Sequence, residues 1–185
     1  MLTFIRYEIR GREKIDLNKS YIYSSNHTSF LDAPGLALGV PTQFRPLAKK
    51  ELKKIPIFGL IVRVVTIVVD RSSPASRRKS IENLKSILKQ GISILIFPEG
   101  TQNRTDQPLQ PFYDGAFRIA LQTETAIAPI MILNAGKLMA PSSLSVRPGK
   151  IKVLFADPIE VKGLTMEDLP ELKRRTREVM LSMIE

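Results

Sequence analysis

Cysteine is absent from this sequence of 185 residues, and histidine occurs only once. Without cysteine the chain has no disulfide framework, no thiol nucleophile and no sulfur ligands for a metal. A single histidine does not make a histidine-rich metal site either. The sequence therefore predicts no structural zinc.

A long apolar run is also missing. The best candidate, IPIFGLIVRVVTIVV at residues 55–69, is shorter than the roughly 18 to 20 apolar residues of a spanning helix and carries Arg63 in its middle. Residues 1–14 lack the apolar centre and the cleavage site of a secretory signal. We therefore expect a cytoplasmic origin and no membrane-spanning helix.

Aromatic residues are few, at 6% of the chain, and no nucleic-acid-binding motif is recognisable. Lysine and arginine number 28 against 18 acidic residues, so the formal net charge is +10. This excess favours an anionic partner such as nucleic acid, a phosphorylated substrate or an acidic lipid surface. The low aromatic content weakens the case for nucleic acid.

The length and the 43% hydrophobic content suit one well-packed domain over residues 1–185, and no internal repeat is present. Short β-rich runs alternate with helical patterns, which predicts a single α/β domain with a mixed, mostly parallel sheet of about seven strands flanked by helices. The expected strands lie within residues 3–10, 20–25, 42–48, 66–70, 91–98, 126–133 and 150–156. The expected helices cover 74–90, with Ser73 as cap and Gly91 after the end, about 115–123, and the chain from about Glu171.

The only histidine, His27, lies in the segment SSNHTSFLD, where the strand at 20–25 should end and a helix should begin. Asp32 follows five residues later, and a bend at the helix start would bring its carboxylate back to the imidazole. The carboxylate would then hold one tautomer while the other ring nitrogen removes a proton from a hydroxyl. The alternative for the pair alone is a surface histidine near an aspartate that favours the helix dipole.

A second candidate is FPEGT at residues 97–101, directly after the apolar strand ISILI. Gly100 would permit close approach of a ligand, and backbone N–H groups of the turn would face an oxyanion. Glu99 would accept hydroxyls or orient basic groups. The alternative is an ordinary β-turn.

Together these stretches resemble the glycerolipid acyltransferase family, whose best-known members are the 1-acyl-sn-glycerol-3-phosphate acyltransferases. The similarity covers about residues 20–135, in four blocks that occur in the family's order. The matching positions are Asn26, His27 and Asp32 in the first block, Asp70 and Arg71 in the second with Lys49, Glu51, Leu52, Pro56 and Gly59 upstream of it, FPEGT in the third, and Pro129 within IAPIMI in the fourth.

The resemblance implies a glycerol-3-phosphate acyltransferase-like fold and transfer of a fatty acyl group from acyl-CoA or acyl-carrier protein to a lipid hydroxyl. His27 would deprotonate the hydroxyl and Asp32 would orient His27, so that the oxygen attacks the thioester directly and no acyl-enzyme forms. No metal or redox cofactor is implied. The residues agree, since there is no cysteine and no GxSxG elbow.

The resemblance also implies a set of substrate-binding residues. Lys49 and Arg71 would hold an anionic acceptor, as a point charge and a bidentate fork respectively. The full set of expected substrate-binding positions is Asn26, Lys49, Asp70, Arg71, Glu99, Gly100, Thr101 and Arg104.

Two stretches depart from the family's pattern. Gln102 and Asn103 follow FPEGT where arginine and serine are usual, with Arg104 displaced by two residues, and Tyr113 and Asp114 replace basic side chains downstream. The leading hypothesis is acylation of 1-acyl-sn-glycerol-3-phosphate to phosphatidate in phospholipid biosynthesis. The alternatives are O-acylation of another lysolipid, such as a lyso amino-acid lipid, and a non-enzymatic basic module that binds membrane or nucleic acid.

Many relatives carry additional N-terminal helices that anchor them in the bilayer, and here the first block begins almost at once. The sequence predicts either a truncated or divergent form, or a peripheral protein at the cytoplasmic face of the cell membrane. In the second case its basic surface and an apolar ledge at IPIFGLIV would make the attachment. The alternative for IPIFGLIV is an ordinary buried helix.

Overall fold

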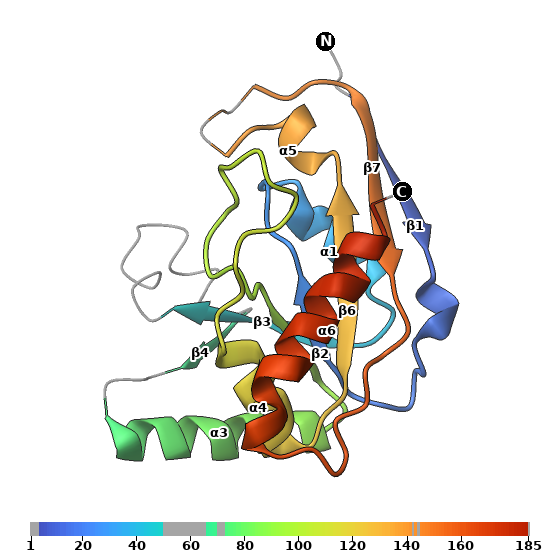
Figure 1. The fold of residues 1–185 in the computed structure, drawn as a ribbon. Coiled ribbons are helices and arrows are strands. Elements are labelled where there is room, and N and C mark those ends of the chain that lie inside the picture. The colour runs from blue at the N-terminus through green and yellow to red at the C-terminus, as the bar shows by residue number, and fades with distance from the viewer. Residues whose placement is uncertain (1–3, 50–65, 70–72, 142, 144, 185) are drawn as a thin grey trace.

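The fold is seen in a computed structural model, which describes residues 4–49, 66–69, 73–141, 143 and 145–184 (Figure 1). Its centre is a sheet of seven strands in the order β1-β7-β6-β2-β5-β3-β4. All neighbouring strands are parallel except β6 and β7. The strands are β1 (Ile5–Arg10), β2 (Ile22–Ser25), β3 (Phe44–Lys49), β4 (Ile67–Val69), β5 (Ser93–Ile96), β6 (Ile127–Leu133) and β7 (Gly149–Phe155). The predicted single α/β fold with a mixed, mostly parallel sheet is confirmed.

The helices form where the capping signals stand in the sequence. Ser73 caps α3, because its side chain accepts a hydrogen bond from the backbone of Ser76, and Pro74 occupies the first helical position. Gly91 follows the end of α3 with φ +78°, a conformation that favours glycine. The helices are α1 (Asp32–Gly39), α3 (Pro74–Lys89), α4 (Gly115–Thr123), α5 (Ala135–Leu138) and α6 (Leu169–Ser182), with short 3-10 helices η1 (Arg12–Lys14) and η3 (Met166–Asp168).

The last helix begins at Leu169, two residues before the expected start at Glu171. The difference has a local cause. Thr165 and Asp168 form a reciprocal capping box, and Pro170 lies in the first turn, where its missing N–H is not needed.

Two groups of apolar side chains cover the two faces of the sheet. Successive residues of a strand point to opposite faces, so Ile22 packs with α3, α4 and α6 while Tyr21 and Tyr23 pack with α1. Figure 1 shows α6 crossing β6 on the face that it shares with α3 and α4. Among the described helices of two turns or more, α1 alone packs on the other face.

The parallel arrangement of β2, β5 and β6 places their carboxyl ends at one edge of the sheet. The loop before α1, the segment after β5 and the start of α5 follow these ends, and Figure 1 shows them toward the same end of the molecule. Within the described ranges, every helix is too short or too polar to cross a bilayer.

Candidate active site

His27 lies in the loop that leaves β2 and leads into α1. The Nδ1 atom of its ring is 2.9 Å from Oδ2 of Asp32, the first residue of α1. The Asp32 side chain is fully buried, whereas the imidazole keeps 24% of its surface exposed. The contact that the sequence predicts is therefore present, and its part in catalysis stays a prediction.

The same carboxylate oxygen also organises the loop in front of the helix. Oδ2 of Asp32 accepts the backbone N–H groups of Thr28 and Ser29 at 2.7 and 2.9 Å. Its other oxygen, Oδ1, is buried and has no hydrogen-bond partner among the described residues. One oxygen thus fixes the imidazole and the backbone that carries it, which is why the aspartate has to follow the histidine by only a few residues.

The direction of the hydrogen bond between His27 and Asp32 defines the chemistry of the imidazole ring. A carboxylate accepts the proton on Nδ1, so the neutral imidazole has an unprotonated Nε2 that is able to take a proton. The ring also stacks on Phe97, with centroids 4.2 Å apart and planes inclined by 20°. The arrangement supplies an oriented, partly exposed base.

Glu99 of the FPEGT turn reaches the histidine loop through the backbone. Its Oε1 accepts the N–H of His27 at 3.1 Å, and its Oε2 accepts the N–H of Gln110 at 2.8 Å. The side chain is 1% exposed, and burial raises the pKa of Glu99 more than these two hydrogen bonds lower it. Both oxygens therefore point to the protein's own backbone, and the expected contact with substrate hydroxyls stays a prediction.

Asn103 holds the other backbone group of His27. Its N–H donates to the His27 carbonyl at 2.6 Å. Its side chain closes the loop that follows, because Oδ1 accepts from Thr105 and Gln110 and Nδ2 donates to the carbonyl of Gln107. The sequence identifies Asn103 only as a departure from the family's serine, and it does not reveal that Asn103 binds the backbone of His27 or that Gln110 binds Glu99 and Asn103.

Asn26, beside the histidine, joins the loop to β6. Its Nδ2 donates to the carbonyl of Ile132 at 2.9 Å, and its Oδ1 accepts the N–H of the same residue at 2.7 Å. The residue is 1% exposed. Both amide atoms are thus used in the scaffold, and the substrate contact expected of Asn26 stays a prediction.

Gly100 is required by the shape of the FPEGT turn. Its φ is +72°, and a Cβ atom there would lie 3.0 Å from the ring of Tyr113. Its N–H donates to the carbonyl of Phe97 at 3.0 Å, so that this N–H is engaged within the turn. Thr101 and Arg104 are exposed in the segment that follows.

The structure brings Asn26, His27, Asp32, Glu99 and Gly100 together at one edge of the sheet. Lys49 is the last residue of β3, and its side chain is outside the described part. Asp70 and Arg71 lie outside the described residues, as do Glu51, Leu52, Pro56, Gly59 and the whole of the expected ledge at IPIFGLIV. The expected roles of these residues stay predictions.

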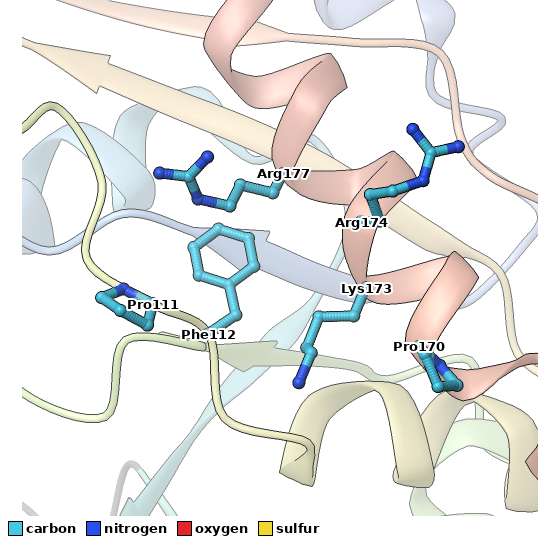
Figure 2. A pocket seen from close by; sticks show the side chains of 6 residues that line it. All are labelled: Pro111, Phe112, Pro170, Lys173, Arg174 and Arg177. Carbon is cyan, nitrogen blue, oxygen red and sulfur yellow. The ribbon is translucent and has the colours of Figure 1, made fainter.

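A hollow of about 310 Å³ lies apart from the histidine, between the segment before α4 and the helix α6 (Figure 2). Lys173 at this hollow pairs with Asp114 at 2.7 Å, and Arg174 pairs with Glu171 and Glu178. Asp114, which replaces a basic residue of the family, is thus engaged with α6. The hollow is lined by Pro111, Phe112, Pro170, Lys173, Arg174 and Arg177.

No cluster of three or more metal-ligating side chains occurs in the described part of the chain.

Comparison with known proteins gives the family. A sequence model of the acyltransferase family matches residues 6–133, which is more than half of the chain. The chain belongs to the acyltransferase family. The match includes the His27–Asp32 pair and the FPEGT turn, so the geometry described above is that of the family's matched region.

Relatives within this family are similar along most of the chain. Human 1-acyl-sn-glycerol-3-phosphate acyltransferase alpha is 30% identical over 181 residues, which are 97% of this chain and 64% of the relative. The coconut 1-acyl-sn-glycerol-3-phosphate acyltransferase is 36% identical over 145 residues, 77% of this chain and 47% of the relative. The chain thus spans less than two thirds of these relatives.

A solved structure of the family has the same fold. The 1-acyl-sn-glycerophosphate acyltransferase PlsC of Thermotoga maritima aligns with a TM-score of 0.76 at 28% identity, over 95% of this chain and 69% of that one. The acyltransferase fold therefore extends beyond residue 133 to nearly the whole sequence.

Proposed function

We propose that this chain is an O-acyltransferase that moves a fatty acyl group from a thioester to the free hydroxyl of 1-acyl-sn-glycerol-3-phosphate, giving phosphatidate. The observation that carries the proposal is the 2.9 Å contact between His27 Nδ1 and the buried Asp32 carboxylate. Membership of the acyltransferase family and the names of its relatives support the same reaction.

The reaction needs one base and no covalent intermediate. Nε2 of His27 takes the proton of the acceptor hydroxyl while the oxygen attacks the thioester carbonyl, and the buried carboxylate stabilises the resulting imidazolium. The tetrahedral intermediate then collapses, the carbon–sulfur bond breaks, and the imidazolium returns its proton to the leaving thiolate. The products are an ester and a free thiol, and His27 is again neutral.

Glu99 and Asn103 support this base without touching the reacting atoms. The N–H of His27 is bound by Glu99 and its carbonyl by Asn103, so the peptide groups on either side of the base are fixed. Such preorganisation lowers the cost of reaching the reactive geometry. The donor is acyl-CoA or acyl-carrier protein, and no further cofactor takes part in the proposal.

Gln102 gives a reason for a second candidate acceptor. The family's usual arginine is replaced there by a neutral amide, which favours a lyso amino-acid lipid as the alternative acceptor. Arg104 is exposed two residues later and has no ion-pair partner within the described ranges. Together with Lys49 and Arg71 it favours the phosphate as first choice.

The location that suits this activity is the cytoplasmic face of the cell membrane, with the protein bound peripherally. The net charge of +10 supports contact with an anionic lipid surface.

A panel of lysolipids tests the proposal. Purified protein is mixed with acyl-CoA or acyl-carrier protein and one lysolipid at a time, and released thiol and new ester are both measured. Brisk ester formation on lysophosphatidate is expected. Turnover only on a lyso amino-acid lipid would favour the second candidate, and no turnover on any lysolipid would favour a non-enzymatic binding module.

A further inference from the structure

The outer side of α1 and of the residue pair before it is apolar throughout. Phe30 and Leu38 are 55% and 56% exposed. The only charged residue of the helix, Asp32, is buried, which is the reverse of an ordinary surface helix. The exposed positions follow a spacing that aligns them on one side of a helix, and we name them the α1 stripe: Phe30, Ala33, Pro34, Ala37 and Leu38.

The other side of α1 is fixed on the sheet. A Cβ atom on Gly35 would lie 3.0 Å from the ring of Tyr7, and one on Gly39 would lie 3.1 Å from Val153. The hydroxyl of Tyr7 also donates to the carbonyl of Leu31 at 3.0 Å. Because the helix backbone is this close to β1 and β7, rotation cannot bury the α1 stripe.

The α1 stripe begins beside the catalytic base. Phe30 follows His27 by three residues. The imidazole stacks on Phe97, and Phe97 packs against the same apolar group as Leu36 on the inner side of α1. The base and the α1 stripe therefore belong to the same face of the sheet.

Two exposed cations belong to α5 and to the segment that bonds to the end of α5. Lys137 is exposed in α5, and α5 is close to the loop because a Cβ on Gly136 would lie 3.2 Å from Thr28. Arg147 is exposed as well, and its N–H donates to the carbonyl of Leu138 at the end of α5. Neither cation has an ion-pair partner within the part of the chain that the structure describes.

We propose that the α1 stripe is the surface by which this protein lies on an anionic lipid bilayer, with Phe30 and Leu38 at the boundary of headgroups and acyl chains and with Lys137 and Arg147 at lipid phosphates. An exposed apolar helix face together with unpaired cations supplies the two contributions by which peripheral proteins bind anionic bilayers, namely apolar burial at the headgroup boundary and attraction to lipid phosphates. The inference rests on the proposed function in one respect, because a lipid acceptor would then enter from the bilayer directly beside His27.

A second copy of the chain fits this surface less well. A stable dimer interface needs roughly 800 Å² on each partner, from about 20 to 30 residues, and the α1 stripe has only five. A two-fold interface would also bring the same surface of both copies together, so that the flanking cations would approach each other.

Vesicle flotation with the whole chain tests the apolar part. The double variant Phe30→Gln and Leu38→Gln is compared with wild type on vesicles of phosphatidylcholine alone and of phosphatidylcholine mixed with phosphatidylglycerol. We expect binding to both kinds of vesicle to weaken by about tenfold or more, because the side chains that enter the lipid are gone. Leu17→Gln is the matched control, since Leu17 is 67% exposed but precedes β2 at the opposite end of that strand, and its binding should stay within about twofold.

The charge part has its own pair of variants. Lys137→Gln with Arg147→Gln should weaken binding to the anionic vesicles by about tenfold and leave binding to neutral vesicles unchanged. Lys89→Gln, an exposed cation at the end of α3, is the control and should change neither. Equal loss on both kinds of vesicle, or none on the anionic ones, would overturn the role given to the cations.

Two further measurements separate this inference from its alternatives. Turnover of short-chain, water-soluble substrates should stay within about twofold in the stripe double variant, since no bilayer is involved. Unchanged vesicle binding by the double variant would overturn the proposal. If wild type were a dimer and the double variant a monomer, the α1 stripe would instead be a self-interface. Absence of acyl transfer in every variant would overturn the proposed function, while the flotation result would still decide the membrane contact.

Discussion

The substitution Asp32→Asn tests the geometry most sharply, because it keeps the size of the side chain and removes its charge. Oδ2 of Asp32 accepts three N–H groups, from His27, Thr28 and Ser29. An asparagine that keeps its oxygen there turns its NH₂ toward the position of Oδ1, where the described residues offer no partner. The free energy of unfolding should fall by about 1 to 3 kcal/mol, the usual cost of a buried polar group without a partner.

The effect on turnover follows from the charge. When His27 takes the proton of the hydroxyl, its ring becomes a cation, and a carboxylate stabilises that cation better than an amide does. A charge-assisted hydrogen bond exceeds a neutral one by about 1 to 2 kcal/mol, so kcat should fall by at least about 5- to 30-fold. The KM for the acceptor should change little, because the side chain of Asp32 is fully buried.

The assay is steady-state release of free thiol over a range of lysophosphatidate concentrations, with urea unfolding as the stability measurement. Asp157→Asn is the control, because that carboxylate is 81% exposed and pairs with Lys14 at the surface. A well-folded Asp32→Asn variant with unchanged kcat and a raised KM would refute the orienting role and indicate a binding role.

Three further predictions concern the segment around FPEGT. Gly100→Ala should lower the free energy of unfolding, measured in urea, at least about 1 kcal/mol further than Gly163→Ala does. Both glycines have positive φ, but of the two only Gly100 has a side chain, that of Tyr113, within 4 Å of an added Cβ, so equal losses would contradict the clash. Burial raises the pKa of Glu99, so the stability of wild type relative to Glu99→Gln should be highest in acid and should fall as the pH rises above 4.5, the usual pKa of glutamate. Urea unfolding at several pH values checks this, and the opposite slope would contradict it. Gln102→Arg should leave or improve turnover of lysophosphatidate in the thiol-release assay and impair that of a lyso amino-acid lipid, and a loss on lysophosphatidate would argue against the phosphate acceptor.

Much of the fold could be predicted because local signals coincide with its elements. Apolar runs such as ISILI become buried strands, and all seven expected strands are present within a few residues of their expected ends. Ser73 and Pro74 fix the start of α3 in the same way. The start of α6 is harder to predict, since the capping box of Thr165 and Asp168 caps the short helix η3, which runs directly into α6.

The candidate site was predictable only where its contacts are local in sequence. His27 and Asp32 are five residues apart, so a turn followed by a helix was enough to bring them together. The bonds from Glu99 and Asn103 to the backbone of His27 join segments 72 and 76 residues apart. Such bonds depend on which loops meet at the carboxyl edge of the sheet, which no local pattern specifies.

The α1 stripe shows a third limit of sequence reasoning. Residues 30–39 are apolar apart from Asp32, so they have the composition of a helix buried on all sides. Whether a further layer covers the outer side depends on the tertiary arrangement. The sequence instead favours IPIFGLIV as the apolar ledge, and that segment lies outside the described residues.

The central claim is that His27 is the base of an acyl transfer, and the most direct measurement is ester formation by purified wild type and His27→Ala with the same thioester and lysophosphatidate. Wild type should form phosphatidate and release one thiol for each ester. The His27→Ala variant should retain the unfolding midpoint to within a few degrees, because the imidazole is partly exposed, and should lose at least about a hundredfold in turnover. A well-folded His27→Ala variant with turnover within about tenfold of wild type would contradict the account, since general-base catalysis contributes roughly 10² to 10⁴.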